Sequence, residues 1–89
     1  MKEETKLFKA LANERRLLIL HHLNTTSPMT VNSIAKRIKL SFKSTSKHLQ
    51  ILYIAGLVRR EQTSSQMKYW PNADHQSVKK SIDQIIKRK

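Results

Sequence analysis

The side chains best suited to chemistry lie close together in the stretch SFKSTSKHLQILYIAG, at residues 41–56. Lysines, serines and a histidine recur there at helical spacing, and such side chains bind phosphate oxygens and the edges of bases. Lys43 and Lys47 would lie in the first two turns of a helix, where the helix dipole disfavours a cation by roughly 0.3 to 1 kcal/mol. A phosphate backbone across that end would reverse the penalty. From this stretch alone, a nucleic-acid contact and an ordinary solvated helix face are both open.

Catalytic and metal chemistry find little support in the rest of the sequence. The chain has no cysteine, which excludes disulfides and thiolate metal ligands, and it has only six acidic residues. The sequence also has no glycine-rich phosphate loop and no nucleophile paired with a base. We therefore expect neither an enzyme nor a protein with a bound cofactor.

The charge of the chain favours a nucleic-acid partner. Eighteen basic and six acidic residues give a formal net charge of +12, and residues 31–50 hold five basic residues and no acidic one. A basic block on a helix points to nucleic acid before a membrane surface or an acidic protein. No apolar run is long enough to span a membrane, and MKEETK has no signal-peptide core. We expect a cytoplasmic, nucleoid-associated protein without a membrane partner.

The elements around the basic block predict a helix-turn-helix. Residues 31–38 should form a helix capped by Thr30, and a tight turn leads to a longer basic helix capped by Ser41. Gly56 should close that second helix, because glycine is the usual residue just past a helix end. A short helix, a turn and a longer basic helix make up this DNA-binding motif. The longer helix should turn one stripe inward, formed by Thr45, Leu49, Leu52 and Ala55.

The remaining segments complete a single domain over residues 1–89. Their periodicity changes from helical to β-prone after Gly56 and back again before the last helix. The expected fold is mostly α with a small β-hairpin, in the order α-α-α-α-β-β-α. Further helices are predicted over residues 3–11, from Asn13 to about residue 23 and over residues 73–88, and the hairpin over residues 57–62 and 67–70.

Three motifs resemble the ArsR-type winged helix-turn-helix transcriptional regulators. They are FKALANERRLLIL at residues 8–20, STSKHLQIL at residues 44–52 and AGLVRR at residues 55–60. The resemblance implies a winged-helix homodimer that places two recognition helices in successive major grooves of double-stranded DNA, at an inverted-repeat operator. It also implies a repressor that a metal ion or another signal releases. The residues that match the family pattern are Asn13, Arg16, Ile19 and Leu20 on the second helix, and Ser46, His48 and Leu49 on the recognition helix.

The same resemblance implies a set of DNA contacts. Serine and lysine lack the bidentate geometry of arginine on guanine, so much of the affinity should be electrostatic and salt-dependent. We expect a structural or phosphate-contacting role for His48 rather than a metal-binding one. The expected DNA-binding residues are Lys43, Ser44, Thr45, Ser46, Lys47 and His48 on the recognition helix, and Arg59, Arg60, Gln66 and Lys68 on the hairpin.

Apolar stripes on the two terminal helices, at about residues 3–11 and 73–88, predict the dimer interface. A chain of 89 residues has a small core, so pairing with a second copy favours stability. The expected interface residues are Leu7, Phe8, Leu11, Val78, Ile82, Ile85 and Ile86.

The metal sites of the family have no counterpart in this sequence. Arsenic and lead sensors carry a Cys-x-Cys pattern on the third helix, where this chain has TVNS at residues 30–33. Zinc sensors carry Asp-x-His and a later histidine pair on the last helix, whereas Asp74 is followed directly by His75 and no pair follows. His21 and His22 lie at the C-terminal end of a helix, where positive charge is favoured. We therefore expect no metal site.

The turn of the helix-turn-helix is a further departure, because Lys39 stands where many family members have glycine. If this residue must adopt a positive φ, the lysine costs roughly 1 kcal/mol.

Two other function classes are open. A nonspecific architectural nucleic-acid binder could use the same fold, and the high charge without arginine on the recognition helix would suit it. A protein-interaction module is the other, although the all-basic central block argues against it unless the partner is acidic. Enrichment of a palindromic site from random duplexes would favour the sequence-specific regulator.

Overall fold

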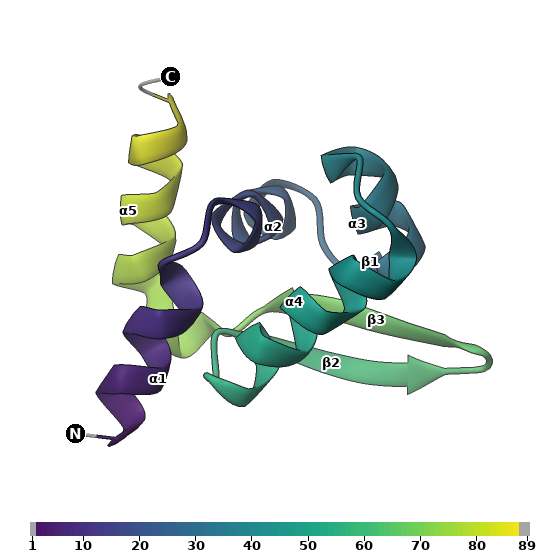
Figure 1. The fold of residues 1–89 in the computed structure, drawn as a ribbon, viewed down its shortest axis with the longest axis horizontal. Coiled ribbons are helices and arrows are strands. Elements are labelled where there is room, and N and C mark those ends of the chain that lie inside the picture. The colour runs from purple at the N-terminus through teal and green to yellow at the C-terminus, as the bar shows by residue number, and fades with distance from the viewer. Residues whose placement is uncertain (1, 88–89) are drawn as a thin grey trace.

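The computed structural model describes residues 2–87, apart from the side chains of residues 76, 77, 79, 85 and 87. It is mostly helical, with one three-stranded sheet (Figure 1). None of the helices described is long and apolar enough to cross a membrane. The elements are α1 (Lys2–Leu11), α2 (Glu14–Thr25), β1 (Met29–Thr30), α3 (Val31–Ile38), α4 (Phe42–Ile54), β2 (Val58–Thr63), β3 (Gln66–Pro71), a 3-10 turn η1 (Ala73–His75) and α5 (Gln76–Lys87).

Side-chain caps begin three of the helices, as the sequence predicts. The Asn13 side chain accepts from the N–H of Arg16 at the start of α2. Thr30 caps α3 and Ser41 caps α4, and each side-chain oxygen accepts a backbone N–H three residues later, at 3.2 and 3.1 Å. Each cap satisfies a backbone donor that the first turn leaves free. α2 runs to Thr25, about two residues beyond its predicted end.

Gly56 closes α4, as predicted, in the left-handed conformation with φ of 78°. The N–H of Leu57 donates to the carbonyl of Leu52 at 3.0 Å, and that of Gly56 donates to the carbonyl of Tyr53 at 3.0 Å. This pair of bonds is the Schellman motif, which satisfies carbonyl groups at a helix end. Leu52 and Leu57 are both buried, so the C-terminal end of α4 and the residue that follows Gly56 are packed in the core.

The sheet has one strand more than predicted. β2 and β3 form the expected antiparallel hairpin, with Thr63 opposite Gln66 around a two-residue turn. β1 pairs with the other edge of β3, and Met29 lies opposite Tyr69. A two-residue strand has no readable periodicity, so the sequence predicted no strand before the helix cap Thr30. In Figure 1 the hairpin projects past the helices, while α1 and α5 lie at the opposite end of the molecule.

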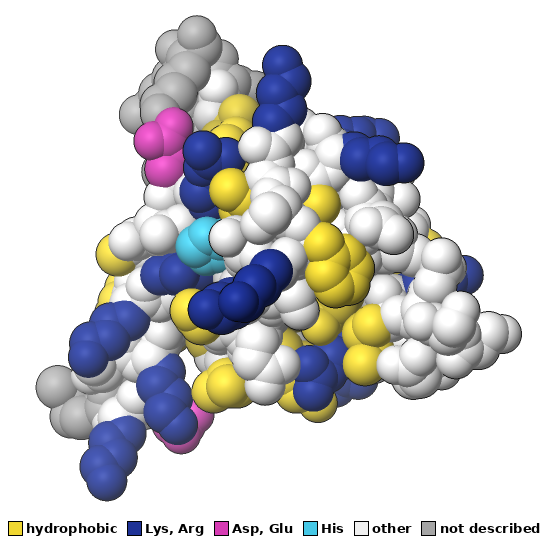
Figure 2. Space-filling view, turned by 45° about the vertical axis from the view of Figure 1, so that its right-hand side comes forward, with side chains coloured by type: hydrophobic (Ala, Val, Ile, Leu, Met, Phe, Trp, Pro, Cys, Tyr) yellow, Lys and Arg dark blue, Asp and Glu magenta, His cyan; other side chains and the backbone are white. Residues whose placement is uncertain are grey.

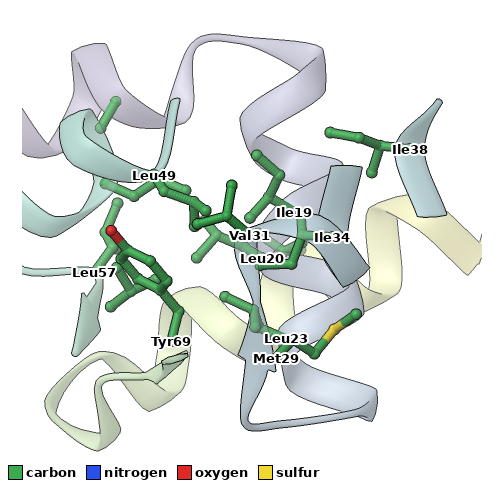
Figure 3. Close-up of a cluster of buried hydrophobic side chains, with 14 residues drawn as sticks. Ile19, Leu20, Leu23, Met29, Val31, Ile34, Ile38, Leu49, Leu57 and Tyr69 are labelled. Carbon is green, nitrogen blue, oxygen red and sulfur yellow. The ribbon is translucent and has the colours of Figure 1, made fainter. Parts of the chain in front are cut away.

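The core is centred on α2, which contacts α1, α3, α4, α5 and β3. Figure 3 shows buried side chains from α2, α3, α4 and β3 converging on one cluster. Burying a large aliphatic side chain is worth about 1.5 to 3 kcal/mol, so this cluster is what holds α4 in place. Its completely buried aliphatic members include Ile19, Leu23, Ile34, Leu49 and Leu52.

Candidate nucleic-acid interface

α4 presents its two lysines to solvent. Lys43 and Lys47 are exposed, whereas Leu49 and Leu52 are completely buried on the opposite face. Thr45 is also completely buried. The spacing therefore placed Thr45 correctly on the inward stripe, and its inclusion among the DNA contacts was wrong, because a side chain in the core cannot reach DNA.

The other predicted contacts lie on accessible parts of α4 and the hairpin. Ser44, Ser46 and His48 are half-buried on α4. Figure 2 shows basic side chains spread over this face, with hydrophobic side chains between them and few acidic ones. The hairpin residues divide into exposed Arg59 and Gln66, and half-buried Arg60 and Lys68.

A groove of about 560 Å³ lies between α3, α4 and the hairpin. Its lining contains hydroxyl and amide side chains and a single charged residue, Arg60, without any carboxylate. Such a lining can donate hydrogen bonds to phosphate or base oxygens and would not repel a polyanion. The polar members are Thr30, Asn32, Ser46, Gln50, Arg60, Gln62, Ser65, Gln66 and Tyr69.

Among the groove residues that belong to α4, two were missing from the sequence-based contact set, Phe42 and Gln50. They are spaced four residues to either side of Ser46, so all three form one stripe along α4 and line the groove. Phe42 is 55% exposed, and it is the first residue of the helix. The four-residue spacing within the predicted helix was the signal that could have identified both.

Arg60 joins the hairpin to α4. Its Nη1 donates to Oε1 of Gln50 at 2.7 Å. Its guanidinium carbon lies 3.8 Å from the centre of the Tyr53 ring, which is a cation–π contact. The hairpin is therefore tied to the helix at the same residue that lines the groove.

His48 is held by Arg16 of α2. Nη1 of Arg16 lies 3.2 Å from Nδ1 of His48. Arginine has only donors, so Nδ1 must accept and the proton of the neutral ring must be on Nε2. Burial lowers the pKa of His48 below its ordinary value, and the charges of Arg16 and Arg15 lower it further. His48 is thus a neutral ring that carries its proton on Nε2 and is bonded to α2 through Nδ1, and its phosphate-contacting role stays a prediction.

Arg15 and Arg16 also bind the C-terminal ends of two other helices. Arg16 donates from Nε to the carbonyl of Ala10 at 2.6 Å and from Nη2 to that of Lys9 at 3.1 Å, at the end of α1. Arg15 donates to the carbonyl of Ile38 at 3.1 Å, at the end of α3. Cations are favoured at these ends because the last carbonyls carry partial negative charge. Arg16 therefore links α1, α2 and α4 through one side chain.

His21, near the end of α2, contacts a carboxylate of α5. Nδ1 of His21 lies 3.2 Å from Oδ1 of Asp83 on α5, and Nδ2 of Asn24 donates to the same oxygen at 3.3 Å. Burial lowers the pKa of His22, and the charges of His21 and Arg37 lower it further. Within the described part of the chain, no three histidine or acidic side chains are grouped as metal ligands.

The predicted dimer residues divide between surface and core. Phe8 is 67% exposed on α1, while Leu7, Leu11, Val78 and Ile86 are half-buried against the core. Ile82 is only 4% exposed and belongs to the core of its own chain. It is therefore unavailable to a second subunit, and we remove it from the expected interface. The side chain of Ile85 lies outside the described residues.

Comparisons with known proteins agree with this geometry. Residues 13–60 match the model of the bacterial regulatory proteins of the arsR family. HlyU from Vibrio cholerae is 32% identical, with a TM-score of 0.79 over 94% of this chain and 88% of that chain. NolR from Sinorhizobium fredii is 27% identical, with a TM-score of 0.81 over 94% of this chain and 84% of that chain.

A third solved structure is a homodimeric winged helix-turn-helix DNA-binding domain from Mycobacterium bovis, described as a possible ArsR-family transcriptional regulator. It is 27% identical, with a TM-score of 0.80 over 94% of this chain and 75% of that chain. Comparison with curated proteins gives no significant match. The family match runs from the cap of α2 into the hairpin, and HlyU aligns along nearly the whole chain, so the chain belongs to the ArsR family of bacterial regulatory proteins and has the winged-helix fold of these transcription regulators.

Proposed function

We propose that the chain is a homodimeric, sequence-specific repressor that binds double-stranded DNA. α4 would enter the major groove, and the hairpin would lie along the phosphate backbone as a wing. The observation that carries the proposal is the pair of exposed lysines, Lys43 and Lys47, in the first two turns of a helix buried on its opposite face. The carboxylate-free groove beside them supports it, because a polyanion meets no like charge there.

Self-association is part of the proposal. Phe8 leaves two thirds of its surface in water, and Leu7 and Leu11 are half-buried beside it on α1. Val78 and Ile86 of α5 are also half-buried, so both terminal helices offer apolar surface to a second copy. The homodimeric relative from Mycobacterium bovis adds support. Two copies related by a two-fold axis would read two half-sites about one helical turn apart.

Selection from a pool of randomised duplexes, with binding followed at two salt concentrations, tests this function. We expect enrichment of an inverted repeat. Lys43→Gln and Lys47→Gln should each reduce the slope of log affinity against log salt by about one. Lys80→Gln is the matched control, since this exposed lysine lies on α5, and it should leave the slope unchanged.

The second candidate is a nonspecific architectural binder. The net charge of +12 and the absence of arginine from α4 favour it. Strongly salt-sensitive binding to every duplex, without an enriched motif, would support this reading and contradict the sequence-specific repressor. A protein that binds no duplex even at low salt would contradict both and would point to a protein partner.

A further inference from the structure

We propose that Arg60 is a positioning residue, which orients the Gln50 amide to read a base, rather than a phosphate contact of the wing. The inference rests on the proposed DNA-binding function and names a residue through which that function becomes sequence-specific. Neither residue was expected to act in this way from the sequence, where Arg60 was grouped with the phosphate contacts and Gln50 had no role.

The first step is the orientation of the amide. Nη1 of Arg60 lies 2.7 Å from the side-chain oxygen of Gln50. A guanidinium group can only donate, so it must face the amide oxygen and not the amide nitrogen. The two N–H donors of Gln50 are therefore turned away from Arg60. Within the described part of the chain, no recorded hydrogen bond uses that amide nitrogen.

The second step is the immobilisation of Arg60 itself. Its guanidinium carbon lies 3.8 Å from the centre of the Tyr53 ring, and Tyr53 lies three residues after Gln50 on the same helix. The guanidinium group is thus held by a hydrogen bond and by an aromatic face, both from α4. A cation engaged on two sides is less free to follow a phosphate than one that extends into solvent.

The third step is the location of Gln50. Its side chain is exposed and lies on the stripe with Ser46 that lines the groove beside the hairpin. Paired N–H donors from this position match the acceptors on a major-groove edge, which are O6 and N7 of guanine, N7 of adenine and O4 of thymine. The amide oxygen keeps a second lone pair beside the one that accepts from Arg60, so the bond to Arg60 fixes where the donors point and not which of these bases they read.

Arg59 provides a matched control on the same strand. It is adjacent to Arg60, and successive side chains of a strand point to opposite faces. The side chain of Arg59 is exposed, and no hydrogen bond or ring contact of that side chain is seen among the described residues. It is the better candidate for a phosphate contact on β2.

The experiment uses the operator that the wild-type protein selects, together with its single-base-pair variants, at two salt concentrations. Arg60→Met should lower discrimination at one base pair of each half-site by about fivefold to tenfold, the lower end of the range for base contacts, and leave the salt slope unchanged. Gln50→Ala should lose discrimination at the same base pair, and the double variant should lose no more. Arg59→Met should reduce the salt slope by about one with discrimination intact.

Opposite results would overturn the inference. A salt slope that falls by about one in Arg60→Met, with discrimination unchanged, would make Arg60 a phosphate contact. A loss spread evenly over all base pairs would exclude a role through Gln50. A wild-type protein that selects no duplex would instead overturn the proposed function, so the two failures are distinguishable.

A second variant keeps the test independent of any folding defect in Arg60→Met. Tyr53→Leu retains the charge of Arg60 and removes the ring beneath it. Discrimination should fall at the base pair that Gln50 reads, and circular dichroism should show an unchanged helical fold. Full discrimination in a folded Tyr53→Leu protein, together with a folded Gln50→Ala protein that discriminates normally, would overturn the inference.

Discussion

Thr45 carries a buried hydroxyl group that has no hydrogen-bond partner among the described residues. A buried polar atom without a partner costs about 1 to 3 kcal/mol, because it loses its hydrogen bonds to water. The residue lies on the inner face of α4, directly behind the proposed DNA-binding surface. Its hydroxyl is therefore a small destabilising feature in the helix that the proposed function uses most.

Thr45→Val should raise the free energy of unfolding by about 1 kcal/mol, since valine has the same shape without the hydroxyl. DNA affinity should not change, because the side chain is in the core. Urea denaturation and a binding titration on the same preparation measure both quantities. Thr45→Ala is the control and should destabilise, since it leaves a cavity. Weaker DNA binding by a stable Thr45→Val protein would show that Thr45 contributes to DNA contact after all.

His48 makes stability depend on pH. Burial, and then the charges of Arg16 and Arg15, lower the pKa of His48 below its ordinary value of 6.5. The folded protein therefore binds a proton on this ring less readily than the unfolded chain does. The stability due to the neutral ring is complete above about pH 6.5 and is lost as the pH falls from there towards the lower folded pKa.

His48→Gln should lose less stability than the wild type when the pH is lowered through this range. The glutamine oxygen can still accept from Arg16, so the bond to α2 is kept without a titrating group. Thermal melts at several pH values measure the difference. His22, whose pKa is also lowered, contributes equally to both proteins and provides the common background. Parallel pH profiles would show that the His48 ring does not titrate with folding.

At the scale of elements, the turn between α3 and α4 determines how these two helices are oriented in the helix-turn-helix. Lys39 ends α3 with φ of 56° and ψ of 50°, so the condition stated for this position, a positive φ, is met. This conformation raises the free energy of a residue that has a Cβ by about 1 to 2 kcal/mol, whereas glycine adopts it without that cost. Lys39 holds this conformation while its N–H and that of Leu40 donate to the last carbonyls of α3.

Lys39→Gly should stabilise the protein by about 0.5 to 1 kcal/mol, once the greater freedom of glycine in the unfolded chain is subtracted. For a chain of this size, that corresponds to a rise in Tm of several degrees, on the order of 2 to 8 °C. Lys39→Ala keeps the Cβ while removing the charge, and it should show no such gain. Equal stabilisation by alanine would attribute the effect to charge instead of backbone strain.

The elements also show which features a sequence can predict. Thr30, Ser41 and Gly56 were identified correctly, because capping depends on residues a few positions apart. Strand β1 was missed, since two residues have no period and only pairing with β3 defines them. The contacts of Arg16 with His48 and of Arg60 with Gln50 join different elements, 32 and 10 residues apart in the chain, so the spacing within one helix cannot reveal them.

At the scale of the whole molecule, a substitution of Phe8 tests the proposed homodimer. Phe8→Ser should weaken self-association by about tenfold or more, because truncating a central aromatic at an interface typically costs at least 1 to 2 kcal/mol. Sedimentation over a range of concentrations measures it. Phe42→Ser is the matched control, since that phenylalanine is 55% exposed on α4. Equal dimerisation by both variants and the wild type would place the interface elsewhere.

The pairing of β1 with β3 has a consequence for how the protein is made. Met29 precedes the recognition helix in the chain, and its partner Tyr69 follows it. During synthesis α4 therefore leaves the ribosome before the strand that completes the sheet and supplies Tyr69 to the core. Domains generally fold as units once their last core segment is available. A nascent chain that ends before the wing therefore lacks part of the core, including Tyr69, and the domain is complete only once β3 has been made.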